Sequence, residues 1–134
     1  MISQLSTHGA RSVDVLIVGA GQAGLSLSYC LTRDGIQHLI LERAQVAESW
    51  RNARWSSFCL VTPNWAINLA GRPYRGPEPG GFMPRDDLVE YLESYAASFD
   101  APVRAPCTVV RVEPIAAAGL LAVETDTGDV YNAK

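Results

Sequence analysis

Hydrophobic positions near the N-terminus follow the pattern of alternating strand and helix. Residues 13–18 are β-branched and nearly all apolar, as is typical of a strand buried on both faces of a parallel sheet. A glycine-rich turn follows, and apolar residues then return at helical spacing until Asp34 and Gly35, where Gly35 suits the left-handed position after a helix. Residues 38–42 are again mostly apolar and predict a second strand. This order predicts a βαβ unit.

The stretch 43–82 shows little regular pattern, and its prolines interrupt any long element. It nevertheless holds all three tryptophans of the chain, so we expect it to wrap around something rather than to hang free. For Trp55 and Trp65 we expect core packing. For Trp50, core packing and contact with a ligand are equally open.

Regular pattern returns at residues 85–99, where an apolar stripe predicts a helix. The stripe consists of Leu88, Tyr91, Leu92, Tyr95 and Phe99. Asp87 and Glu90 form a plausible capping box, although Asp86 is an equally good cap.

Residues 107–112 and 120–124 read as strands, and a third strand begins at Val130. Because 125–129 has the composition of a hairpin turn, the C-terminal third predicts a small antiparallel meander. The fold class is therefore α/β, Rossmann-like, with a parallel sheet begun by the βαβ unit. Residues 1–12 are polar and aperiodic and are expected to be a flexible leader, and residues 13–134 are expected to form one domain.

Composition removes several classes of function. The 134 residues are 48% hydrophobic and carry a net charge of −3, with ten of the eleven basic residues being dispersed arginines, so neither nucleic acid nor a membrane surface is an expected partner. The longest aliphatic run, 15–18, is far below the roughly 20 residues that span a bilayer. The N-terminal residues lack the charged and then apolar segments of a signal peptide, so the expected location is cytoplasmic. Three widely spaced cysteines fit no zinc motif, and no metal site is expected.

The glycines at 19, 21 and 24 fit G-x-G-x-x-G directly after the first strand and at the start of the helix. In this context Gly19 permits the sharp turn, Gly21 lets the backbone approach a pyrophosphate, and Gly24 lets helix and strand pack closely. The free N–H groups of the helix would face the phosphates. An ordinary tight strand–helix connection is the plain alternative.

Glu42 weighs against that alternative, because it ends the second strand 23 positions after Gly19. A carboxylate there accepts hydrogen bonds from the ribose hydroxyls of an adenosine and repels a 2′-phosphate. The sequence therefore predicts a dinucleotide site that rejects NADP.

NAD and FAD share this fingerprint, and the rest of the chain favours FAD. It continues with an aromatic loop, a helix and a meander, and it resembles the N-terminal FAD-binding region of flavin-containing and Baeyer–Villiger-type monooxygenases and their YUCCA-like relatives. The resemblance rests on GAGQAG (19–24), LILE (39–42), ESWRNARWSSFCLVTP (48–63) and FMPRDDLVEYLESYA (82–96).

The resemblance implies a set of cofactor contacts. Gln22 and Ala23 lie with the three glycines in the turn that holds the cofactor. Further contacts are implied for Glu42 with the ribose, Arg43 beside the adenine, Trp50 and Arg51 along the flavin side, Thr62 and Asn64 near the isoalloxazine, and the Val110 backbone at the adenine. Arg51 is otherwise a solvated surface residue.

The resemblance also implies the chemistry of the whole protein. NADPH would reduce FAD, and the reduced flavin would form a C4a-peroxide that oxygenates a small organic substrate. The chain contains no second G-x-G-x-x-G, so we expect it to be the N-terminal part of a longer protein, without an NADPH domain and inactive alone. No catalytic residue is assigned, and the oligomeric state is left open. A non-catalytic FAD- or ADP-binding module is the alternative.

Cysteine usage excludes a related class of protein, the glutathione-reductase-like flavoenzymes with a redox-active cysteine pair. Dithiol enzymes need two thiols within bonding reach, whereas the region after the acidic strand end holds Cys59 alone. We expect Cys59 and Cys107 to be small buried hydrophobes.

Overall fold

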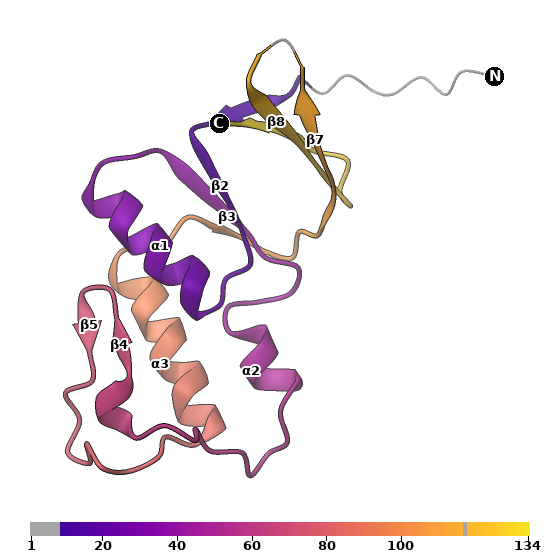
Figure 1. Cartoon of the computed structure of the whole chain (residues 1–134). Helices are drawn as coiled ribbons and strands as arrows, with labels where there is room; N and C mark the ends of the chain where they lie inside the picture. The colour runs from indigo at the N-terminus through magenta and orange to yellow at the C-terminus, as the bar shows by residue number, and fades with distance from the viewer. Residues whose placement is uncertain (1–8, 117) are drawn as a thin grey trace.

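A computed structural model, which describes residues 9–116 and 118–134, contains a three-stranded parallel sheet in the order β2-β3-β6 (Figure 1). The strands are β2 (Val15–Val18), β3 (His38–Leu41) and β6 (Val103–Arg104). Helix α1 (Gln22–Arg33) connects β2 to its parallel neighbour β3, so the predicted βαβ unit is confirmed.

Helix α1 ends where the sequence indicates. Asp34 is the C-cap, and Gly35 follows with a φ of +70°, in the left-handed region that favours glycine. The helix is also tied to β3 through a polar pair, because the fully buried Ser28 hydroxyl lies 2.7 Å from His38 Nε2. His38 Nδ1 lies 2.9 Å from the carbonyl oxygen of Ile36. Both ring nitrogens are therefore engaged within the protein.

The predicted second helix is α3 (Arg85–Ser98), and its apolar stripe is confirmed by the burial of Leu88, Leu92 and Tyr95. The predicted capping box is wrong, because the N-cap is Pro84 and no side chain caps the helix. Asp86 and Asp87 instead lie in the first turn, where their charge complements the positive end of the helix dipole.

The stretch between β3 and α3 holds four short elements that local periodicity is too brief to reveal. They are α2 (Glu48–Asn52), the 3-10 helix η1 (Asn64–Ala66), β4 (Asn68–Leu69) and β5 (Arg72–Pro73). Both expectations for Trp55 and Trp65 are wrong, since they are 66% and 67% exposed. Trp55 packs edge-on against Phe58 at 5.1 Å between ring centroids and so covers the surface of the loop rather than the core.

The meander is confirmed and gains a fourth strand. Strands β7 (Val109–Ile115), β8 (Leu120–Thr125) and β9 (Val130–Ala133) pair antiparallel, and β1 (Arg11–Val13) pairs parallel with β9. The flexible leader is therefore wrong for Arg11 and Ser12, because β9 offers an edge that they complete. Gly9 and Ala10 are exposed and belong to no helix or strand, and the rest of the predicted leader, residues 1–8, lies outside the described residues.

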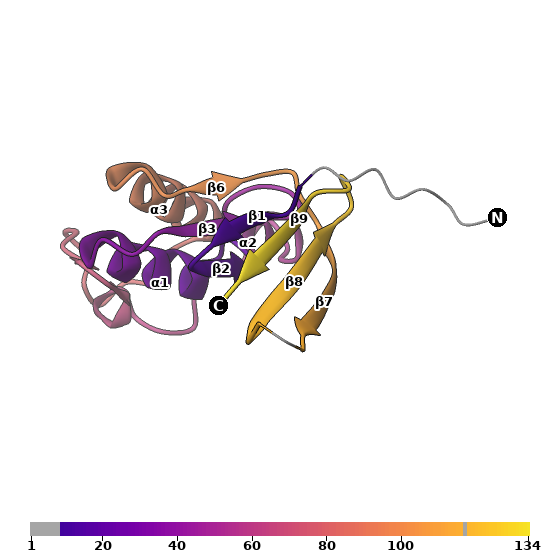
Figure 2. The ribbon, with the colours of Figure 1, turned by 90° about the horizontal axis from the view of Figure 1, so that it is seen from above.

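The parallel sheet buries both of its faces, as its apolar strands indicate. Ile17 and Ile40 face the helices, in a cluster with Leu25, Leu92 and other side chains of α1 and α3. On the other face Leu41 packs with residues of the meander and its approach, namely Cys107, Val123 and Tyr131. Figure 2 shows the parallel strands between α1 and α3 on one side and the meander on the other.

Candidate functional site

The glycine-rich turn between β2 and α1 has the geometry that its glycines allow. Gly19 has a φ of +100°, which L side chains rarely adopt. A Cβ on Gly24 would lie 2.1 Å from the carbonyl oxygen of Gly19, so any side chain there would collide with the backbone of the turn. Gly24 therefore allows close packing of helix and strand, as predicted.

Gly21 differs from Gly19 and Gly24 in that no described residue and no backbone angle requires a glycine there. Its φ is −91°, and a Cβ there would meet no atom within 4 Å. In the described part of the chain, no acceptor takes a hydrogen bond from the N–H groups of Gly21, Gln22 or Ala23. The N-terminus of α1 thus presents free donors, and its positive dipole end, next to open space.

Glu42 lies beside this turn and is only 6% exposed. Its Oε2 accepts the N–H of Ala20 at 2.8 Å, and its Oε1 accepts the N–H of Ala44 at 3.0 Å. The carboxylate therefore holds the turn after β2 and the turn after β3 together. Glu42 thus has a structural role that its spacing alone did not reveal, and its contact with a ribose stays a prediction.

A first cleft of about 400 Å³ opens between these two turns and the start of the meander. Four of the predicted residues line it, Gly19, Gly21, Glu42 and Arg43. The other lining residues are Val18, Leu41, Glu48, Ser49, Cys107, Thr108 and Val109.

Three backbone hydrogen bonds hold the far wall of the first cleft, and two of them join it to Glu42. The N–H of Cys107 donates to the carbonyl of Glu42 at 2.8 Å, and the N–H of Glu42 donates to the carbonyl of Arg104 at 3.0 Å. Farther along this wall, Thr108 accepts at its carbonyl from the N–H of Asp126 at 2.9 Å. The segment that leads from β6 into the meander is therefore held against the end of β3.

A second cavity of about 300 Å³ lies at the other side of the α1 N-terminus. Its lining includes the predicted residues Gln22, Trp50 and Thr62, and apolar side chains from α3. Trp50 packs against the core as well, which confirms the first of the two expectations left open for it, and its contact with a ligand stays a prediction. The Arg54 guanidinium lies over the Trp50 ring at 5.4 Å.

Five predicted residues line neither the first cleft nor the second cavity, namely Ala23, Gly24, Arg51, Asn64 and Val110. Arg51 forms an ion pair with Glu93 and ties α2 to α3. Asn64 is buried and donates to the carbonyl of Glu78 at 2.9 Å, thereby pinning a loop. Val110 is 60% exposed at a register shift in β7, and its neighbour Val109 lines the first cleft instead.

Sequence reasoning missed the wall residues Cys107, Thr108 and Val109, and Ser49 near the start of α2. For Ser49 the sequence offers one signal: its neighbour Glu48 is acidic, which is typical of the first turn of a helix and indicates that a helix begins there. Thr108 and Val109 look like ordinary strand residues, and nothing local marks them. Ala23 is exposed in the first turn of α1.

Other kinds of site receive no support from the described residues. No group of three or more His, Cys, Asp or Glu side chains in them is arranged to hold a metal ion. All three cysteines are free, and Cys107 is buried as predicted, whereas Cys59 is exposed, contrary to prediction, in the segment between α2 and η1. None of the described helices has both the length and the apolar character needed to cross a bilayer.

Comparison with known proteins assigns the family. Residues 16–134 match the family described as pyridine nucleotide-disulphide oxidoreductase, and the chain belongs to it.

Individual relatives are flavin enzymes and oxidoreductases. The chain is 36% identical over 102 residues to an uncharacterized CzcO-like oxidoreductase of Geobacillus kaustophilus, over 75% of this chain and 29% of the relative. It is 32% identical over 120 residues to the indole-3-pyruvate monooxygenase YUCCA1 of Oryza sativa, over 89% and 29%. A flavin-containing monooxygenase from Stenotrophomonas maltophilia superposes with a TM-score of 0.79 at 32% identity, over 92% of this chain and 36% of that one.

These likenesses confirm the resemblance to an FAD-binding region of flavin monooxygenases that the sequence indicates. The chain spans less than a third of the length of the two curated relatives.

Proposed function

We propose that this chain holds FAD as part of an NAD(P)H-dependent flavoprotein oxidoreductase, a monooxygenase acting on a small organic substrate. The diphosphate binds at the N-terminus of α1, the adenosine in the first cleft, and the flavin side extends toward the second cavity. Family membership and the similarity to flavin monooxygenases support this assignment. A cytoplasmic location stays a prediction.

The observation that carries the proposal is the open cradle at Gly21. A Cβ at this position would occupy space that no atom of residues 9–116 and 118–134 fills, next to three backbone N–H groups that have no acceptor among these residues. A diphosphate needs both features, close approach to the backbone and donors aimed at it. The residues present therefore fit an FAD diphosphate.

The remaining contacts follow from chemistry and position. The Glu42 carboxylate lines the first cleft and is suited to the ribose hydroxyls, while its charge disfavours a 2′-phosphate. Gln22, Trp50 and Thr62 line the cavity on the flavin side. When bound, FAD supplies two-electron redox chemistry with a nicotinamide donor and with oxygen. The chain's own residues bind and orient it.

The test is binding of FAD to the full 134-residue chain, followed by visible absorbance and calorimetry. We expect the wild type to bind FAD, and Gly21→Ala to reduce the affinity about tenfold or more, because the added methyl group enters the cradle. Gly80→Ala is the matched control, since a Cβ there also meets nothing within 4 Å and lies far along the chain in a loop. Equal FAD affinity in Gly21→Ala and Gly80→Ala would contradict the assignment.

A second measurement concerns the hydride donor. The family resemblance implies that NADPH binds at a second glycine-rich motif, and residues 1–134 do not contain one. We therefore expect NADPH to leave the absorbance of oxidised flavin on this chain unchanged. Rapid, stoichiometric bleaching would show a donor site within residues 1–134. A chain that folds but binds neither FAD nor ADP would contradict the proposed function and would favour the non-catalytic alternative.

A further inference from the structure

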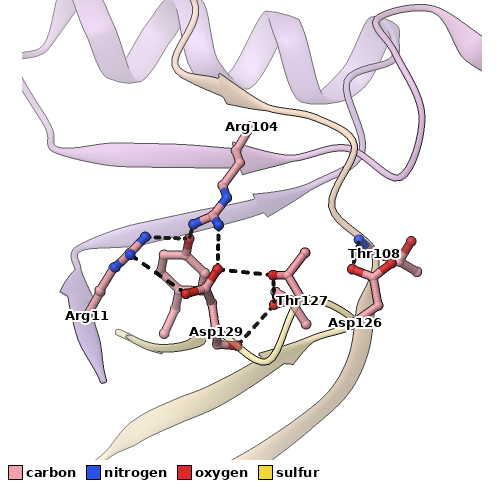
Figure 3. A network of polar contacts seen from close by, with 8 residues as sticks. Arg11, Arg104, Thr108, Asp126, Thr127 and Asp129 are labelled. Carbon is pink, nitrogen blue, oxygen red and sulfur yellow. Dashed lines mark hydrogen bonds and ion pairs between the residues drawn. The ribbon is translucent and has the colours of Figure 1, made fainter. Parts of the chain in front are cut away.

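A loop that lines neither the first cleft nor the second cavity contacts both the wall of the first cleft and strand β6. The loop connects β8 to β9 and contains Asp126, Thr127 and Asp129. Figure 3 shows Asp126 directed at Thr108 and Asp129 directed at Arg104 and Arg11. The loop therefore contacts the cleft wall at one end and strand β6 at the other.

The first tie is reciprocal. Asp126 Oδ1 accepts the N–H of Thr108 at 2.9 Å, and the N–H of Asp126 donates to the carbonyl of Thr108 at 2.9 Å. Thr108 precedes β7, and the register of β7 with β8 shifts between Val109 and Arg111. The strand ladder is thus interrupted next to the cleft, and Asp126 supplies the hydrogen bonds that hold the wall there.

The second tie runs through an ion pair. Asp129 pairs with Arg104 and lies 3.7 Å from Arg11, and its side chain is 19% exposed. The carbonyl of Arg104 accepts the N–H of Glu42, the residue on the opposite side of the cleft. Together with the hydrogen bond from Cys107 to Glu42, these contacts form a closed circuit from Glu42 through Arg104, the loop and Thr108 back to Glu42.

We propose that Asp126 and Asp129 are positioning residues for the adenosine end of the dinucleotide. They hold the Cys107–Val109 wall at a fixed separation from Glu42, and this separation sets the affinity for adenine nucleotides. The inference rests on the proposed function, because it places the adenosine in the first cleft. Neither aspartate lines the cleft, so both act through the backbone and Arg104.

The test measures the affinity of the full chain for FAD and for ADP by calorimetry. Asp126→Ala removes the acceptor for the Thr108 N–H, and we expect both affinities to fall about fivefold, the effect of one lost hydrogen bond. Asp126→Asn keeps an oxygen acceptor at the same place and should bind within about twofold of wild type. Hydrogen exchange at the Thr108 amide should be faster than in the wild type for Asp126→Ala but not for Asp126→Asn.

Asp87→Ala is the control for loss of an exposed negative charge, because Asp87 lies in the first turn of α3 and lines neither hollow. If Asp126→Ala does not fold, Asp129→Ala tests the same circuit by cutting the tie to Arg104, with the same fivefold expectation.

The outcomes separate the two proposals. A wild-type chain that binds neither FAD nor ADP overturns the proposed function and this inference with it. A wild-type chain that binds both, with Asp126→Ala or its substitute Asp129→Ala binding equally well, overturns only the positioning role. Equal losses in Asp126→Asn and Asp126→Ala overturn it as well, since the acceptor oxygen would then be irrelevant.

Discussion

Glu42 Oε2 accepts the backbone N–H of Ala20 at 2.8 Å. The carboxylate at the end of β3 therefore holds the glycine-rich turn at the end of β2, 22 residues earlier in the chain. Because a carboxylate oxygen accepts more than one hydrogen bond, the same group keeps capacity for a ligand in the cleft. One residue thus shapes the turn and presents an acceptor to it.

Removing this carboxylate should affect both stability and binding. Glu42→Ala leaves the N–H groups of Ala20 and Ala44 without their acceptors, and we expect a loss of about 1–3 kcal/mol in the free energy of unfolding. Adenosine binding should also weaken by about 1–3 kcal/mol. Urea denaturation and FAD titration measure the two effects. Unchanged FAD affinity in a folded variant would remove Glu42 from the site.

The two glycines Gly21 and Gly24 should respond oppositely to alanine. A Cβ on Gly24 would lie 2.1 Å from the Gly19 carbonyl oxygen, so Gly24→Ala should destabilise the fold by about 2 kcal/mol or more. Gly21→Ala meets no atom and should keep its melting temperature within a few degrees while losing FAD affinity. Thermal unfolding without ligand separates them, and equal melting temperatures would refute the difference.

Aromatic residues should divide into core and surface. Tyr95 is 1% exposed and donates its hydroxyl to the carbonyl of Ala70 at 2.5 Å, so Tyr95→Ala should cost about 3–5 kcal/mol in unfolding free energy. Trp55 is 66% exposed, and Trp55→Ala should change it by only about 0.5 kcal/mol. Chemical denaturation of both variants provides the check. A large loss in Trp55→Ala would mean that the loop packs differently.

Arg51 provides a test against the family resemblance, which places it along the flavin. In the structure it pairs with Glu93, and both side chains are partly exposed. Arg51→Ala should therefore leave FAD affinity unchanged and reduce stability by no more than about 1 kcal/mol. Glu93→Ala should have a similar effect on stability. A selective loss of FAD binding in Arg51→Ala would place it at the cofactor after all.

Acid should weaken the loop between β8 and β9. The hydrogen bond from the Thr127 hydroxyl, with the charges of Arg104 and Arg11, holds the pKa of Asp129 below its ordinary value of 3.8. A carboxylate whose pKa is lowered in the folded state contributes stability that is present above pH 3.8 and is lost as the pH falls through the lowered pKa. We expect Asp129→Asn to flatten the fall in melting temperature below about pH 4. Parallel curves for variant and wild type would contradict this.

The strongest predictions from sequence concern segments whose pattern is complete within a few residues. Three such patterns are the apolar residues of β2 and β3, the glycines between these strands and the apolar stripe on α3. Each depends only on residues close together in the chain, and the structure confirms the two strands and the helix. The short α2 and the two-residue strands β4 and β5 have too few residues to show any period. The expected core packing of Trp55 is wrong because a tryptophan in a loop can cover surface as readily as it fills a core.

The amino-acid sequence by itself determined the βαβ unit, the glycine-rich turn and the acidic residue that follows it, because these features depend on neighbours in the chain. Only the tertiary structure decided that Arg11 and Ser12 pair with β9, that Arg51 turns to Glu93, and that Thr108 and Val109 face Glu42. These contacts join residues far apart in sequence. Their partners are chosen by packing and hydrogen bonding in three dimensions, which no local pattern encodes.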